Sequence, residues 1–177
     1  MALITTKAIV LNTLKYGDTS LIVRCFTLKD GLKSYLLKGV LSSKKGKLKA
    51  AYFQPLTQLI IEARHNNKGN LNSIKEVHIT NPYQHIYSNI YKQTIVLFLS
   101  EILSNSIQEE EENGLLFSYL EIALTWLDTH HQISNFHLLF LLSLTKYLGF
   151  YPDITNDTYK YFNLIDGKFT NNSLGLE

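Results

Sequence analysis

Five lysines within twelve residues make 38–49 the segment best suited to chemistry with an anion. It reads KGVLSSKKGKLK, with two glycines and no acid, and its lysines are Lys38, Lys44, Lys45, Lys47 and Lys49. Because ammonium groups neutralise phosphates whatever the base sequence, such a loop can follow a nucleic-acid backbone. A solvated hairpin loop whose charges only maintain solubility would have the same composition.

Charge is divided unevenly along the chain. Residues 1–75 contain thirteen lysines or arginines and three acids, a net charge of +10, whereas residues 76–177 contain four and twelve, a net charge of −8. The two halves nearly cancel in the +2 of the whole chain. This asymmetry predicts a basic domain that binds nucleic acid or another anionic surface, followed by an acidic domain.

The sequence contains few residues in patterns typical of a catalytic or metal site. Cys25 is the single cysteine, which excludes an internal disulfide and a cysteine-based zinc site, and the apolar residues around it predict burial. The spacing of His130, His131 and His137 is not that of a zinc site, and the carboxylates of Glu109–Glu112 would point in different directions on a helix. We find no phosphate-cradling glycine loop, activated nucleophile or paired carboxylates. We therefore expect a binding protein, not an enzyme, with no cofactor and no metal.

No targeting or membrane segment is evident. The N-terminus alternates like a strand and lacks the pattern of a signal peptide. The longest dense apolar run, Phe136–Leu144, is too short to span a bilayer. We expect a soluble, cytoplasmic protein without a membrane partner.

The basic half is patterned as short strands separated by turns. Pro55 must lie at an edge or bulge of its strand, because proline cannot donate to a ladder. Five strands with a long loop between the third and fourth predict a small five-stranded barrel of the OB type, which binds oligonucleotides across one face. The expected strands are Leu3–Leu14, Thr19–Thr27, Leu32–Val40, Ala51–Ala63 and Leu71–Thr80.

Alternation within two of these strands suggests a binding face. Lys33 and Tyr35 share one face of their strand, and Arg24 and Phe26 share one face of theirs. Basic and aromatic side chains on one surface suit backbone contacts combined with base stacking. Tyr35 and Phe26 could instead be ordinary core residues.

The acidic half is patterned as helices. We expect helices over Tyr83–Ile107, Leu115–Leu127 and Phe136–Tyr147, the last being central because it is apolar nearly all round. A hairpin is expected over Tyr159–Thr170, with its turn at Asp166-Gly167. The chain would thus be an α+β protein with a domain of residues 1–80 and a helical domain of residues 81–177 that ends in the hairpin.

The order of these segments resembles the RecO family of bacterial DNA-repair and recombination mediators. The match runs through TKAIVL, YGDTSLIV, a DG turn, LLKGV, the lysine loop and AYFQPL, and continues through EEEENGLLF and FHLLFLLSLTKYLGFYP. It covers roughly residues 3–152. The segment after Pro152 has none of the four zinc-binding cysteines that many members carry there, so folding is expected to need no zinc.

The resemblance implies an OB fold followed by a helical domain, in a nucleoid-associated bacterial protein. Members bind single- and double-stranded DNA, anneal complementary strands, and act with RecR and the single-stranded-DNA-binding protein to load RecA. The expected DNA contacts come from basic residues and from stacking by Tyr35, with Tyr52 as a second stacking candidate. The basic residues are Arg24, Lys33, Lys38, Lys44, Lys45, Lys47 and Lys49.

Two further expectations concern partners. The acidic, apolar-ended tail of the single-stranded-DNA-binding protein needs a cation beside apolar surface, and Lys146 with Tyr147 suits it better than Lys92, the other lysine of residues 76–152. Lys146 could instead only complement the C-terminal end of its helix. An adaptor whose basic OB domain binds RNA or an acidic protein is the alternative to DNA repair.

Overall fold

The computed structural model describes residues 2–42, 48–65 and 71–172. They form two compact units, Met1–Ile133 and Ser134–Glu177. Within the described residues, no helix combines the length and hydropathy needed to cross a bilayer.

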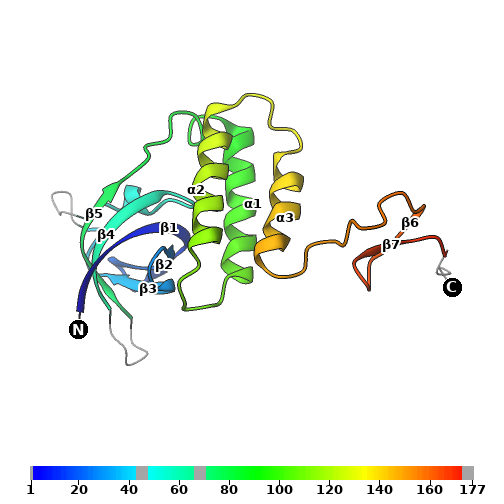
Figure 1. Cartoon of the computed structure of the whole chain (residues 1–177). Coiled ribbons are helices and arrows are strands. Elements are labelled where there is room, and N and C mark those ends of the chain that lie inside the picture. The colour runs from blue at the N-terminus through cyan, green and yellow to red at the C-terminus, as the bar shows by residue number, and fades with distance from the viewer. Residues whose placement is uncertain (1, 43–47, 66–70, 173–177) are drawn as a thin grey trace. The chain divides into compact units, whose positions relative to one another are not determined.

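Five antiparallel strands form a barrel in the first unit (Figure 1). They are paired in the order β3-β2-β1-β4-β5. Asn72 closes the barrel between its two outer strands, because its N–H donates to the carbonyl of Ser34 and its carbonyl accepts from the N–H of Leu36, each at 2.9 Å. The predicted five-stranded OB-type barrel is confirmed. The strands are β1 (Ala2–Tyr16), β2 (Ser20–Thr27), β3 (Gly31–Leu37), β4 (Gln58–His65) and β5 (Ser73–Ile79).

The expected fourth strand, Ala51–Ala63, is wrong in its first half. A 3₁₀ helix, η1 (Ala50–Phe53), comes first, and β4 begins only at Gln58. Pro55 lies in the connection and not at a bulge of the strand, and the next residue, Leu56, has a φ of 58°. The turn brings the N–H of Leu56 to the carbonyl of Val10 at 2.8 Å, so the connection is fixed to β1.

The barrel interior is a single apolar core. Val10, Val23 and Ile61 are fully buried there with Cys25, as predicted for the cysteine. Burial raises the pKa of the Cys25 thiol to about 12, so it is a packing residue and not a nucleophile.

Helices α1 (Ile90–Ser106) and α2 (Gly114–Thr129) lie side by side against the outside of the barrel (Figure 1). Phe26 of β2 packs against Phe117 of α2 with ring centroids 5.8 Å apart, and Ser100 of α1 donates to the carbonyl of Leu11. These two helices belong to the same compact unit as the barrel because they bury their apolar stripes on the sheet, and the domain boundary expected after residue 80 stays a prediction.

Residues 83–89, expected to be helical, form an irregular segment that precedes α1. Asp128 of α2 holds this segment by accepting from the backbone N–H groups of Gln84, His85 and Ile86 at 2.8–2.9 Å. Burial alone would raise the pKa of Asp128, but these three donors hold it below its usual range. Helix α1 is capped by Asn89, whose side-chain oxygen accepts from the backbone N–H groups of Tyr91 and Lys92.

The second unit contains α3 (Phe136–Tyr147) and a hairpin of β6 (Tyr161–Asn163) and β7 (Lys168–Thr170). The expected hairpin is present, with Gly167 at a φ of 64° in its turn and the rings of Phe162 and Phe169 5.0 Å apart. Leu138 and Leu139 of α3 are 57% and 65% exposed, and the central position expected for this helix stays a prediction.

Candidate nucleic-acid interface

The lysine-rich connection between β3 and β4 is only partly described. Lys38 and Lys49 are exposed, and the Nζ of Lys49 lies 5.9 Å from the centre of the half-buried Tyr52 ring. The remaining three lysines of this stretch, Lys44, Lys45 and Lys47, lie outside the described residues. Phosphate contacts by these five lysines stay a prediction.

Tyr35 lies inside the barrel, which corrects the expected stacking role. Its side chain is 0% exposed, and its hydroxyl lies 2.8 Å from the Nε2 of His65. The face that Tyr35 shares with Leu37 is the interior face of β3, since both belong to the barrel core. Alternation therefore assigned these residues to one face, but it could not tell the inside of a closed barrel from the outside.

Arg24 faces the helices. Its Nη1 lies 3.4 Å from the hydroxyl of Ser104 in α1, and its side chain is half-buried. Phe26, two residues later on the same face, is 1% exposed beneath α2. The structure thus places Arg24 at the edge of the helical layer and not on the open surface where a DNA contact was expected.

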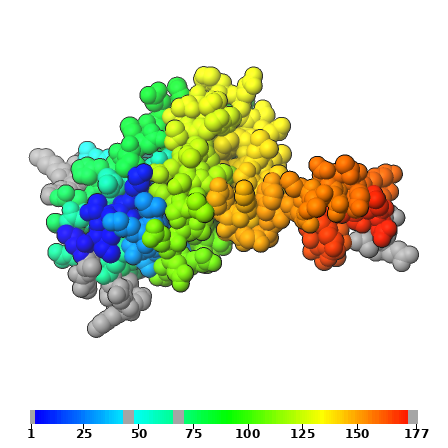
Figure 2. All heavy atoms as spheres, in the orientation of Figure 1, coloured from blue at the N-terminus to red at the C-terminus, as the bar shows by residue number. Residues whose placement is uncertain are grey.

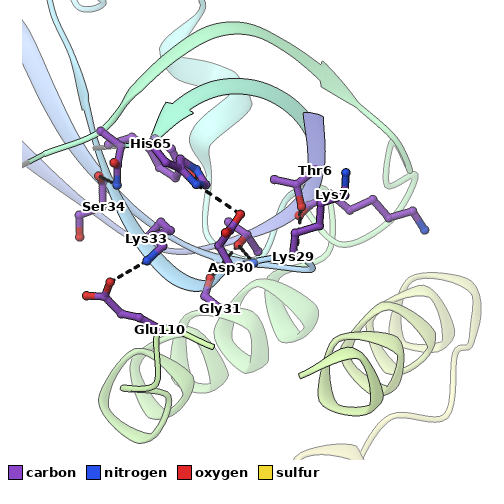
Figure 3. Close-up of polar contacts among 12 residues, drawn as sticks. Thr6, Lys7, Lys29, Asp30, Gly31, Lys33, Ser34, His65 and Glu110 are labelled. Atoms are coloured by element: carbon purple, nitrogen blue, oxygen red, sulfur yellow. Dashed lines mark hydrogen bonds and ion pairs between the residues drawn. The ribbon is translucent and has the colours of Figure 1, made fainter. Parts of the chain in front are cut away.

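Lys33 is paired with an acid of the opposite half of the sequence. Its Nζ lies 2.6 Å from the Oε2 of Glu110, in the connection between α1 and α2 (Figure 3). The side chain of Lys33 is only 18% exposed. The backbone is joined at the same place, since the N–H of Leu32 donates to the carbonyl of Glu109 at 2.9 Å. On the face shown in Figure 2, the β2–β3 hairpin and this acidic connection lie against each other.

Two more lysines of the basic half are paired with acids. Lys7 lies 3.0 Å from Glu121 of α2, and Lys75 lies 2.8 Å from Glu62 on the neighbouring strand. In the part of the chain that the structure describes, no acid pairs with the exposed Lys15, Lys38 or Lys49. The exposed Lys29 and Arg64 likewise have no acid partner within these ranges, so the free positive charge of the described barrel is not confined to Lys15, Lys38 and Lys49.

Hydrogen bonds bring these three lysines to one end of the barrel. Lys15 is paired with Leu21, which is paired with Leu37, the residue before Lys38. The hydroxyl of Thr13 donates to the carbonyl of Phe53 at 2.9 Å, which joins η1 and the preceding Lys49 to the same half of β1. We call this region, defined by Lys15, Lys38 and Lys49, the cationic end.

A row of polar side chains, Tyr35, His65 and Asp30, lies towards the opposite end of β3. The Nδ1 of His65 lies 3.3 Å from the Oδ2 of Asp30, without the alignment of a hydrogen bond, while its Nε2 contacts Tyr35 (Figure 3). Burial lowers the pKa of His65, and nearby Lys33 lowers it further, although Asp30 opposes both. Within the described ranges, no group of three or more histidine, cysteine or acidic side chains could hold a metal ion.

The two lysines considered for a partner's acidic tail differ sharply. Lys92 is 1% exposed and its Nζ donates to the carbonyl of Asp128 at 2.6 Å, so it cannot face a peptide. Lys146 is exposed in the last turn of α3, next to the half-buried Tyr147. Leu142, one helical turn before Lys146, is 45% exposed. A docking role for Lys146 and Tyr147 stays a prediction.

Sequence reasoning overlooked Tyr16, which lies beyond Leu14, the end expected for the first strand. Tyr16 is the last residue of β1 and is 55% exposed, and Leu14 on the same face is 63% exposed. The available signal was the continuation of alternating apolar residues to the last residue of the strand.

Comparisons with known proteins give one consistent family. Residues 1–83 match the model for "Recombination protein O N terminal", and residues 87–174 match that for "Recombination protein O C terminal". A protein from Flavobacterium psychrophilum named DNA repair protein RecO is 57% identical over 167 residues, which are 94% of this chain and 70% of that protein. Proteins of the same name are 52% identical in Christiangramia forsetii, over 94% of this chain and 70% of that protein, and 41% identical in Bacteroides fragilis, over 93% and 69%.

Proposed function

This chain belongs to the RecO family of DNA repair proteins, and from that premise we propose that it is a non-enzymatic recombination mediator that holds DNA at the cationic end of its barrel. The distribution of ion pairs carries the proposal. Lys7 and Lys33, near the helices, are neutralised by Glu121 and Glu110, whereas the lysines of the cationic end form no ion pair with a described acid. A phosphate backbone there would meet net positive charge and would not have to displace a carboxylate from a lysine.

Binding by phosphate contacts is independent of base sequence, as a mediator of strand pairing requires. Lysines on a small barrel lower the repulsion between two complementary strands that approach the same protein. We therefore propose that the protein binds single- and double-stranded DNA, promotes annealing, and helps RecA to load with the aid of RecR. Its place would then be the bacterial cytoplasm, at the nucleoid.

For the single-stranded-DNA-binding protein, we propose that its acidic tail docks at Lys146 and Tyr147 of α3. The exposed Leu138 and Leu142 precede Lys146 by two turns and one turn on the same side of the helix. An exposed cation at the end of an apolar stripe offers an ion pair to the carboxylates of the tail and a contact to its apolar end.

Strand annealing tests the proposal as a whole. Two complementary oligonucleotides, one carrying a fluorophore and the other a quencher, would be mixed with the protein, each strand either naked or coated with the single-stranded-DNA-binding protein. We expect faster annealing in both conditions, and we expect Lys146→Glu to slow only the reaction of coated strands. Equal affinity for an RNA of the same sequence, without any acceleration of annealing, would instead favour an RNA-binding adaptor.

A further inference from the structure

The outer face of β1 and β2 is covered by helices along only part of its length. Phe26 is 1% exposed beneath α2, and Arg24 reaches Ser104 of α1. Beyond Arg24 this face is less covered: Ile22 is half-buried, and Leu14 and Tyr16 are 63% and 55% exposed. An apolar surface of this kind at the end of a strand is suited to a ligand with flat apolar faces.

Tyr16, Ser20 and the start of the lysine-rich connection lie in a row across three strands. Tyr16 is paired with Ser20, and the Oγ of Ser20 accepts from the N–H of Gly39 at 3.3 Å. Lys38, exposed, directly precedes Gly39. Adjacent strands are separated by about 4.8 Å, so the backbones of Tyr16 and Lys38 are about 10 Å apart.

The charge around Tyr16 favours an anionic ligand. Lys15 precedes Tyr16 and is exposed on the opposite face of β1, at the same end of the strand. Leu41 is 44% exposed and donates its N–H to the carbonyl of Thr19 at 2.9 Å, so it adds apolar surface beside the same turn. The acid of this hairpin is Asp18, in the turn itself. Positive charge beside an exposed aromatic ring is the combination that binds single-stranded nucleic acid, where lysines contact phosphates and the ring stacks on an unpaired base.

We propose that Tyr16, supported by Leu14, is a base-stacking platform by which the cationic end distinguishes single-stranded from double-stranded DNA. This inference rests on the proposed DNA binding and adds to it a source of strand preference. Phosphate contacts by Lys15 and Lys38 serve either kind of DNA. Only an unpaired base can leave its neighbours and stack on the tyrosine ring, since the faces of paired bases are occupied within the duplex.

The test compares Tyr16→Ala with Tyr16→Phe in fluorescence-anisotropy titrations of a single-stranded oligonucleotide and of its duplex. Tyr91→Ala is the matched control, since Tyr91 is a tyrosine of α1 that is 74% exposed. We expect Tyr16→Ala to weaken single-strand binding about five- to a hundredfold and to leave duplex binding within about twofold of the parent protein. Tyr16→Phe, which keeps the ring, and Tyr91→Ala should both bind as the parent does.

A second measurement does not depend on loss of a side chain. Tyr16→Trp adds an indole at the platform to a chain whose single tryptophan is Trp126. Saturation with single-stranded DNA should quench this added fluorescence, and saturation with duplex should not.

If Lys38→Ala weakens binding while Tyr16→Ala has no effect, the platform is wrong and the proposed function stands. Equal losses on both kinds of DNA, or an indole that is not quenched, would also overturn the platform, whereas absence of DNA binding by the parent would overturn the proposed function.

Discussion

The Nζ of Lys33 and the Oε2 of Glu110 lie 2.6 Å apart, and this pair joins the basic half of the sequence to the acidic half. The halves carry +10 and −8, yet they are not two separate charged bodies, because α1 and α2 pack on the barrel and bring their connection to β3. Acids of the helical half thereby neutralise the side of the barrel that they cover. The lysines of the cationic end take part in none of these described ion pairs.

If Glu110 holds Lys33 away from DNA, its removal should strengthen binding. We expect Glu110→Gln to raise affinity for single-stranded DNA and to steepen the salt dependence by up to about 0.7 in the log–log slope, since one more lysine becomes available to a phosphate. The stability should change by less than about 1 kcal/mol, because Glu110 is 72% exposed. Glu112→Gln is the control, since Glu112 is also exposed in the same connection. Salt-dependent titrations that show an equal effect of the two variants would mean that only the lower negative charge matters, and not the release of Lys33.

Gly31 should be indispensable to the packing of the acidic connection on the barrel. Its φ is 59°, and an added Cβ would lie 2.4 Å from the carbonyl oxygen of Glu111 and 2.6 Å from that of Glu109. We expect Gly31→Ala to lower the free energy of unfolding by more than about 2 kcal/mol, which sums the strain of the left-handed backbone and the clash.

Gly17→Ala separates these two causes. Gly17 has a φ of 60° but no atom within 4 Å of its added Cβ, so only the backbone strain of about 1 kcal/mol is expected. Urea denaturation of both variants measures the difference. Equal losses would mean that the acidic connection does not pack closely on Gly31.

His65 should make the protein less stable in mild acid. Its folded-state pKa is lowered by burial, so below about pH 6.5 the unfolded chain takes up a proton that the folded protein excludes. The free energy of unfolding should therefore fall as the pH drops from about 6.5 towards the lowered pKa. Urea titrations at several pH values should show a smaller decrease in His65→Gln, whereas the exposed His78→Gln should behave as the parent, and an unchanged decrease in His65→Gln would assign the effect to other groups.

Lys146→Glu should weaken binding of an acidic peptide with an aromatic end several-fold, because the exchange turns an attraction into a repulsion beside apolar surface. Lys92→Glu, the comparison suggested by the sequence, is unsuitable because Lys92 is buried and its replacement would disturb the packing of the helices. Lys160→Glu provides the control, since Lys160 is exposed in the same compact unit. Calorimetric titration of the peptide that shows equal, small effects of both variants would remove Lys146 from the docking surface.

Much of the fold could be predicted because local patterns agree with it. Alternation found the strands, turn glycines placed the hairpins, and the bounds of the third helix were predicted to the residue. Pro55 was placed at an edge or bulge of a strand because a sequence does not show whether the chain leaves the sheet. The first helix was predicted to begin at Tyr83 because its apolar spacing suits a helix, whereas the side chain of Asp128, distant in the sequence, takes up the backbone donors of residues 84–86.

The site was harder to predict than the fold for one physical reason. A closed barrel has an inner and an outer face with the same alternation, and helices from elsewhere in the chain cover part of the outer face. Tyr35 was thus assigned to stacking although it is core, and Arg24 to DNA although it faces α1. Local sequence cannot show that Glu110 pairs with Lys33, since these residues are 77 positions apart.

The central claim is that DNA phosphates contact the cationic end and not the lysines paired with acids. The direct measurement is a salt series of single-stranded-DNA titrations that compares the double variant Lys38→Ala, Lys49→Ala with the double variant Lys7→Ala, Lys75→Ala, which removes the same charge from acid-paired positions. We predict that the first variant lowers affinity and flattens the log–log salt slope by about 1.4, while the second leaves the slope nearly unchanged. Equal changes of slope in the two variants would contradict the claim.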